Sequence, residues 1–391
     1  MERPDVIEFA VPQTLFGVGA VGGIGGVVKS LGAGKLLIVT DRGVTEAGIV
    51  AGVEAALRAG GLEADVYDQV GPEAPVSSID EVVRRARGSG CDLLIGVGGG
   101  SVMDATKVAA LLAANPGTTV QDLVEGRPPA SGLKKLLVPT TSGTGSEWST
   151  VAVFTTDTTD DRNYACVTGA NLPDAVILDP DLTRNLPARM MADAGIDALT
   201  HAIEAYTSSR ANLITDMYAS AAIPLVAASL GPAYAKGSVN AEDRYRLSIA
   251  SAMAMLAGSV GGVGIAHFLN HALHHKKIPL SHGAKVGLLL PYVMEYNLIS
   301  CTGRFAEIAR LLGEETSGLS TVDAALKAVA AVRRLLSALG VPQRLSEVGI
   351  VEADIPGFVD EFMTFQAVPA ALQNPRDVGP DQAAEIFRRA L

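Results

Sequence analysis

Imidazole side chains are strongly clustered in this chain of 391 residues. All six histidines lie between residues 201 and 282, although the chain extends far on both sides. They are His201, His267, His271, His274, His275 and His282. Imidazole is the commonest metal ligand among side chains, so this clustering predicts a metal site.

Asp197 and His201 form the best-defined pair of candidate ligands. They are four residues apart in a run with a helical pattern, which puts both side chains on one helix face. His267 and His271 repeat that spacing, and His282 follows. A carboxylate with several imidazoles suits Fe²⁺ or Zn²⁺. One such pair alone is more often a simple hydrogen bond, but the cluster as a whole favours a metal.

A basic stretch lies inside the histidine cluster. His274 and His275 precede Lys276 and Lys277. The simpler interpretation is a solvated basic turn. The alternative is a loop that attracts an anionic group of a substrate, such as a carboxylate.

A glycine-rich segment, residues 96–101, follows an apolar run and precedes a helical pattern over Val102–Ala114. Glycines let the backbone approach a pyrophosphate, and a helix N-terminus offers free N–H groups to it. We expect phosphate contacts from this glycine-rich segment and a helix cap from Ser101. The alternative is a tight strand–helix turn without a ligand.

Two further segments point to a nucleotide. Residues 139–147 follow another apolar run and combine hydroxyl side chains with two glycines, which suits phosphate or ribose, although a plain turn has the same composition. Residues 17–22 match GxGxxG, and Asp41 lies nineteen residues after Gly22. That spacing is typical of an acid that binds the ribose 2′-OH, which favours NAD over NADP, but a turn residue in solvent is the alternative. Because only a short stretch containing Pro12 precedes Gly17, an ordinary first strand–helix unit is not expected there.

The elements that must position these residues change in type along the chain. Strands are expected at residues 36–40, 64–67, 93–97, 136–138 and 176–178, with helices between them. After residue 181 the patterns predict helices at 186–207, 216–230, 241–256, 304–312, 321–339 and 382–391. We therefore expect a dinucleotide-binding α/β domain over residues 1–181, with a parallel sheet and helices on both faces, and an all-helical metal-binding domain over 182–391.

Composition excludes several other classes. The net charge of −11 argues against nucleic-acid binding, which favours basic patches. Three cysteines without a CxxC motif, and an N-terminus without a signal pattern, suggest a reducing cytoplasmic location. The run 247–275 carries no formal charge apart from its histidines, yet its glycines and histidines indicate a buried helical core and not a membrane span.

Eight sequence segments together resemble the iron-containing (group III) alcohol dehydrogenases. They are Phe16-Gly17, Thr40-Asp41, GGGSVMD (98–104), PTTSGTGSE (139–147), LPDAVILDP (172–180), AGIDALTHAIEAY (194–206), GIAHFLNHAL (264–273) and HGAKVGLLLPYVMEYN (282–297). The resemblance implies a dehydroquinate synthase-like architecture, with the active site in a cleft between the two domains. It also implies NAD-linked oxidation of alcohols or reduction of aldehydes and ketones, and a homodimer.

The resemblance assigns roles residue by residue. It implies that Asp197, His201, His267 and His282 bind the metal, Fe²⁺ by expectation and Zn²⁺ as the alternative, and that His271 lies near the nicotinamide as a candidate proton relay. The positions that match cofactor contacts are Asp41, Gly98, Gly99, Gly100, Ser101, Asp104, Thr140, Thr141 and Thr144.

Three positions depart from the family pattern. Many members carry Asn where Ala74 stands and Lys where Asn163 stands. The interval from His271 to His282 is also one residue longer than expected, so the loop beside the substrate should differ.

Other functions share the same features. Alternatives within enzymes are a hydroxyacid–oxoacid transhydrogenase, a maleylacetate reductase-like enzyme, a lyase related to dehydroquinate synthase and a metal-dependent hydrolase. A nucleotide- or metal-binding module without turnover is the alternative outside enzymes. No membrane partner and no nucleic-acid partner are expected.

Overall fold

The computed structural model describes residues 7, 9–156, 163–236, 239–276, 278–365 and 372–391. The chain divides into two compact units. The sheet unit comprises Pro12–Met191 and Lys236–Ala252, and the helical unit comprises Met1–Val11, Ala192–Ala235 and Met253–Leu391. The domain boundary expected after residue 181 stays a prediction.

The sheet unit is built on six parallel strands in the order β1-β8-β5-β4-β2-β3. They are β1 (Gln13–Phe16), β2 (Leu36–Val39), β3 (Ala64–Tyr67), β4 (Leu93–Gly98), β5 (Lys134–Pro139) and β8 (Ala175–Leu178). The central strands β4 and β2 are buried along their whole length, which explains their unbroken apolar sequences.

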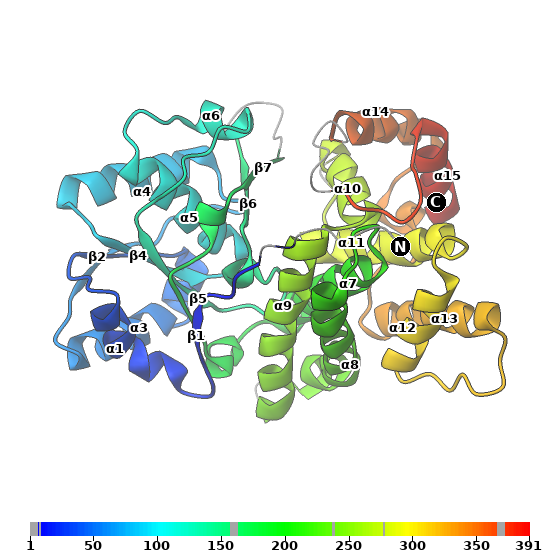
Figure 1. Cartoon of the computed structure of the whole chain (residues 1–391), viewed down its shortest axis with the longest axis horizontal. Coiled ribbons are helices and arrows are strands. Elements are labelled where there is room, and N and C mark those ends of the chain that lie inside the picture. Colours follow the sequence, from blue (N-terminus) through cyan, green and yellow to red (C-terminus); the bar gives the residue numbers. More distant parts are fainter. Residues whose placement is uncertain (1–6, 8, 157–162, 237–238, 277, 366–371) are drawn as a thin grey trace. The chain divides into compact units, whose positions relative to one another are not determined.

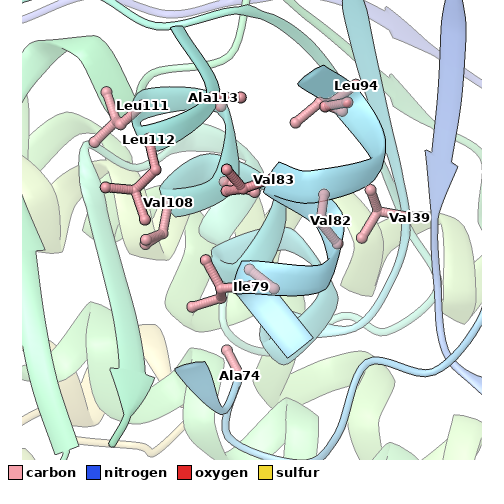
Figure 2. Packing of buried hydrophobic residues seen from close by; sticks show 14 of the residues in the cluster. Val39, Ala74, Ile79, Val82, Val83, Leu94, Val108, Leu111, Leu112 and Ala113 are labelled. Carbon is pink, nitrogen blue, oxygen red and sulfur yellow. The ribbon is translucent and has the colours of Figure 1, made fainter. Parts of the chain in front are cut away.

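Helices cover both faces of this sheet (Figure 1). One core packs α1 (Ile24–Ser30) and α3 (Ile49–Ala59) against the strands. The other packs α4 (Val76–Ser89) and α5 (Gly100–Ala114), and Figure 2 shows Ile79, Val82 and Val83 of α4 near Val108 of α5. The short helices α2 (Arg42–Glu46) and α6 (Val120–Val124) complete the α/β part.

Two strand features were not expected from sequence. The short edge strand β1 pairs with β8. The strands β6 (Val151–Thr155) and β7 (Asn163–Val167) form a separate antiparallel pair that packs on α5. Asn163, one of the departures from the family pattern, therefore begins β7 and pairs with Thr155.

The second part of the chain is a series of helices. They are α7 (Ala188–Thr207), α8 (Leu213–Lys236), α9 (Ala241–Gly261), α10 (Ile265–Ala272), α11 (His282–Asn297), α12 (Thr302–Leu311), α13 (Thr321–Ala338), α14 (Ile355–Phe365) and α15 (Pro380–Ala390). The expected fold class is confirmed: a parallel α/β part followed by a helical part. Length and composition alone would let α8 cross a membrane, but buried core helices pass the same test, and 39% of its apolar window is buried.

Candidate metal centre and nucleotide loops

Three helices of the helical unit bring the candidate metal ligands together. Asp197 lies on α7, His267 on α10, and His282 is the first residue of α11. The start of α11 is held against α7 by Ser281, whose hydroxyl donates to Asp193 Oδ2 at 2.6 Å and also accepts the Ala284 N–H as the helix cap. Only glycine fits at position 283, because a Cβ there would overlap the Asp193 carbonyl oxygen. This close approach places His282 beside Asp197.

The facing atoms of these residues form a ligand set. Asp197 Oδ1 lies 3.5 Å from His267 Nε2 and 3.6 Å from His282 Nε2. One ligand atom from each of the three residues falls within 4.8 Å of the other two. Asp197 Oδ1 and His267 Nε2 are buried, and neither has a hydrogen-bond partner. Buried polar atoms without partners are costly, and a divalent cation between them would remove that cost, so the residues fit a metal.

His201 lies next to this group but not within it. Its ring stacks on that of His267 with centroids 4.3 Å apart, and its Nδ1 lies 4.0 Å from Asp197 Oδ2. That Nδ1 is also buried without a hydrogen-bond partner. His271 is further out, with its ring centroid 6.2 Å from that of His282. We define the ligand cluster as Asp197, His201, His267 and His282.

Charges within the cluster oppose the effect of burial. Burial would raise the pKa of Asp197, but the neighbouring imidazoles, His201 foremost, hold it below its usual range. Burial lowers the pKa of His201 to about 3, so this ring is neutral. Burial would also lower the pKa of His267, but Glu204 and Asp197 outweigh it and raise the value to about 9.

Glu204 was not among the residues singled out from sequence. It is 3% exposed, its Oε2 lies 2.5 Å from His267 Nδ1, and its Oε1 accepts the Ala266 N–H at 2.7 Å. The same carboxylate therefore holds the first turn of α10 and the ring that α10 carries. Its position three residues after His201 on the same helix face could have indicated this role.

In the sheet unit, the predicted nucleotide residues lie at the carboxyl ends of adjacent parallel strands. The strand order reverses between β2 and β4, and ligands of open α/β sheets bind at such a point. Asp41 follows β2, and Gly98, Gly99 and Gly100 lie where β4 meets α5.

The two candidate phosphate loops lie against each other. A Cβ on Gly100 would lie 2.6 Å from the Thr144 side chain, and one on Gly99 would lie 3.4 Å from Thr141. The Thr140 N–H donates to the Gly98 carbonyl at 3.0 Å. Glycine at 100 is thus required by the neighbouring loop even without a ligand.

The predicted cap of α5 is wrong. Gly99 occupies the cap position, and no side chain there bonds to the helix. Ser101 is already inside the first turn, and its hydroxyl accepts the Glu73 N–H at 3.0 Å. Because the helix begins two residues earlier than expected, Ser101 ties α5 to the preceding loop.

Asp41 and Asp104 both have structural roles. Asp41 caps α2 by accepting the Val44 N–H at 3.0 Å. Asp104 accepts the Ser146 hydroxyl at 2.5 Å and the Val153 N–H at 3.0 Å. These bonds use one oxygen of Asp41 and both oxygens of Asp104.

A buried cation completes the surroundings of Asp104. Lys107 is fully buried, and its Nζ donates to Ser146 Oγ at 2.7 Å and to the Val151 carbonyl at 2.8 Å, with Asp104 Oδ1 at 3.8 Å. Burial lowers the pKa of Lys107 to about 8 and raises that of Glu147 to about 7. We define the lysine network as Asp104, Lys107, Ser146 and Glu147.

The first glycine motif has an internal partner. The N–H groups of Gly19 and Val21 donate to the two carboxylate oxygens of Asp179, at 3.1 and 3.0 Å. A carboxylate of the chain thus occupies the place that a phosphate takes in an ordinary GxGxxG loop.

Comparisons with known proteins match both parts of the chain. Residues 12–180 match the family model "Iron-containing alcohol dehydrogenase", and residues 191–391 match "Fe-containing alcohol dehydrogenase family, C-terminal". The chain is 36% identical to 1,3-propanediol dehydrogenase of Klebsiella pneumoniae over 99% of both chains. It is 34% identical to NAD-dependent methanol dehydrogenase of Bacillus methanolicus, over 98% of this chain and 99% of that one.

A solved structure of 1,3-propanediol oxidoreductase has a TM-score of 0.93 at 35% identity, covering 99% of this chain and 100% of that one. The fold, the matched models and these relatives agree with the resemblance seen in the sequence. This chain therefore belongs to the iron-containing alcohol dehydrogenase family of oxidoreductases.

Proposed function

We propose that this protein is a metal-dependent, NAD-linked enzyme that oxidises an alcohol or reduces an aldehyde or ketone. The observation that carries the proposal is the convergence of buried, unpartnered ligand atoms from Asp197 and His267 beside His282. Fe²⁺ is the expected ion, and Zn²⁺ suits the same ligands. A bound divalent ion would supply a Lewis acid that lowers the pKa of an alcohol or polarises a carbonyl.

In this proposal each side chain of the helical unit has a defined task. Asp197, His267 and His282 hold the ion, and His201 completes the set from its position against His267. Asp197 supplies the single negative charge among these ligands. His271 would carry a proton between the substrate oxygen and water.

The loops of the sheet unit would bind NAD. Backbone N–H groups at Gly99 and Gly100 and the hydroxyls of Thr140, Thr141 and Thr144 suit a pyrophosphate, and NAD would supply the hydride carrier. The free oxygen of Asp41 suits a ribose hydroxyl, and its charge disfavours the extra phosphate of NADP. Asp104 would act through the lysine network, because Ser146 and the Val153 N–H already bind its oxygens.

The substrate class follows the named relatives, which act on small alcohols. The basic stretch supports an anionic substrate less than the sequence suggested, because Lys276 pairs with Asp354. Lys277 lies outside the described residues. A homodimer in the cytoplasm remains part of the proposal.

Metal analysis of anaerobically purified protein, followed by NADH formation on an alcohol panel, tests the function. Asp197→Ala and His267→Ala should lose the metal and activity while NADH binding, read by fluorescence, stays within a few-fold. Asp360→Ala, on an exposed carboxylate of α14, is the control and should change neither. Activity that persists without metal after chelation would refute the proposal.

The same assay separates the alternatives. A transhydrogenase would exchange hydride between a hydroxy acid and an oxo acid without releasing NADH. A binding module would retain NAD and metal and show no turnover on any alcohol.

A further inference from the structure

Two imidazoles of the ligand cluster contact different chemical groups through Nδ1, the ring nitrogen that does not face Asp197. His267 Nδ1 lies 2.5 Å from the Glu204 carboxylate, and His282 Nδ1 lies 3.0 Å from the amide of Asn270. In both rings the opposite nitrogen, Nε2, faces Asp197 Oδ1. The groups behind the rings therefore decide which nitrogen carries the proton.

A neutral imidazole that gives its Nε2 lone pair to a metal carries its proton on Nδ1. Ionised Glu204 can only accept a hydrogen bond, so it holds His267 in that tautomer. It is also fixed in place, because it accepts the Ala266 N–H and a Cβ on Gly264 would lie 2.7 Å from its Oε1.

Asn270 can act in either direction because an amide has a donor end and an acceptor end. Its side chain is fully buried, and its Nδ2 faces His282 Nδ1, while its Oδ1 has no hydrogen-bond partner. With Nδ2 donating, the proton of His282 would stay on Nε2 and block the metal. A half-turn of the amide would put Oδ1 opposite Nδ1 and free Nε2.

We propose that Asn270 is a positioning residue that prepares His282 for metal binding, with its Oδ1 accepting the Nδ1–H of His282 in the loaded site. The inference rests on the proposed function. Loading then moves one proton of His282 from Nε2 to Nδ1 through water, with no net release from that ring. At His267, which the nearby carboxylates keep protonated in the metal-free protein, loading releases the Nε2 proton to water while Glu204 retains the Nδ1–H.

A neutral amide has a consequence that a second carboxylate would not have. Asp197 and Glu204 together balance a divalent charge, so a third anion would leave the site negative and weaken the electron-withdrawing power of the ion. The neutral partner also serves the more exposed ring, since the side chain of His282 is 39% exposed and that of His267 is 7% exposed.

Zn²⁺ affinity, measured by competition with a chromogenic chelator, tests the inference. Asn270→Leu keeps the approximate volume but has no acceptor, and it should bind Zn²⁺ about 10–100-fold more weakly. Asn270→Asp keeps an acceptor and should bind at least as tightly as the wild type, with a lower kcat in the Zn²⁺-loaded enzyme. Equal weakening in both variants would overturn the inference.

A second measurement uses the unmodified sequence and does not depend on a variant folding. Nitrogen-15 chemical shifts of histidine-labelled protein should show His267 protonated at Nδ1 with and without Zn²⁺, and His282 at Nδ1 only with Zn²⁺. A proton on Nε2 of His282 in the loaded protein would overturn the inference. If the wild type binds no metal at all, the proposed function fails instead, so the two failures are distinguishable.

Discussion

The lysine network of the sheet unit and the ligand cluster of the helical unit solve one problem in two ways. Both bury carboxylates, which is costly without a cation. The lysine network contains its own cation, and Lys107 reaches Ser146 and a backbone carbonyl at normal hydrogen-bond distances. The ligand cluster leaves Asp197 Oδ1 and His267 Nε2 unpartnered. Glu147 Oε2 of the lysine network also lacks a partner, but the charge of Lys107 acts on it. In the ligand cluster an unpartnered carboxylate oxygen faces an unpartnered imidazole nitrogen, and that arrangement fits a metal.

Removal of Lys107 should cause the largest loss of stability among the changes to these two clusters. Lys107→Met would leave Asp104 and Glu147 buried without a cation, and we expect the free energy of unfolding to fall by about 3–5 kcal/mol. Urea denaturation measures this change. Adding Asp104→Asn to that variant should recover part of the loss, and Zn²⁺ should recover none.

The matching change in the ligand cluster should have a different effect. Asp197→Asn removes a carboxylate that the neighbouring imidazoles stabilise, so it should destabilise metal-free protein, but less than Lys107→Met does because Glu204 still faces His267. It should also abolish the stabilisation that Zn²⁺ gives to the wild type. Similar losses of stability in metal-free Lys107→Met and Asp197→Asn would mean that the two clusters do not differ as described.

The contribution of the lysine network to the free energy of unfolding should depend on pH. Burial, together with Asp104, raises the pKa of Glu147 to about 7 against the opposing charge of Lys107. The folded state then keeps a proton that the unfolded chain releases near pH 4.5, so this stabilisation is complete below pH 4.5 and is lost as the pH rises through 7. Since each pH unit between the folded and unfolded pKa values corresponds to about 1.4 kcal/mol, the loss reaches up to about 3 kcal/mol.

Glu147→Gln should remove that part of the pH profile. Urea midpoints measured between pH 4.5 and 7.5 should fall in the wild type relative to the variant, because the amide does not ionise. Lys107 stays mostly protonated across this range, since its pKa is about 8. Parallel profiles for the two proteins would show that Glu147 does not titrate there.

Gly283 should matter more to the ligand cluster than its size suggests. Gly283→Ala would push α11 from the Asp193 carbonyl and separate His282 from Asp197, with a cost of about 1–3 kcal/mol and weaker Zn²⁺ binding. Gly303→Ala, in α12, is the control, because a Cβ there would meet no atom within 4 Å. Unchanged Zn²⁺ affinity in Gly283→Ala would argue that His282 does not need this close approach.

The two regions also differed in how far sequence could predict them. Strands β2 and β4 were expected because buried central strands are unbroken apolar runs, and the glycine loop followed from its place after β4. Edge strand β1 and the β6–β7 pair were missed, since short strands carry little periodic signal. Helices α11 and α14 were not among the predicted ranges, whereas α10 lies within the run 247–275 that was expected to be buried helical core.

Clustering predicted the residue types of the candidate metal site, but distances across three helices depend on tertiary packing. Spacing put Asp197 and His201 on one helix face, yet the close ligand group contains Asp197, His267 and His282. The sequence did not single out Asn270, because an amide inside an apolar helix gives no signal until its neighbour is known. The Ser101 cap failed because helix ends are the least certain part of any pattern.

The smallest expected effect concerns backbone strain beside the nucleotide loop. Among the described residues, Glu73 and Ala74 are the non-glycine residues with positive φ, at 60° and 51°. This conformation costs about 1–2 kcal/mol per residue, and Asn tolerates it better than Ala, so the backbone at position 74 would favour Asn. The helical unit shows no such strain among the residues that the structure describes.

Glu73→Gly should raise the free energy of unfolding by about 0.5–1 kcal/mol, because relief of strain exceeds the entropy cost of glycine. Ala74→Gly is the matched variant, and there the loss of a fully buried methyl, about 0.8 kcal/mol, should cancel the gain. Urea denaturation of both variants measures the difference. If NADH affinity falls in Glu73→Gly while stability rises, the strain serves to hold the Glu73 N–H on Ser101. The sheet unit would then be less stable for the sake of its nucleotide loop, just as the helical unit is less stable because its ligand atoms lack partners.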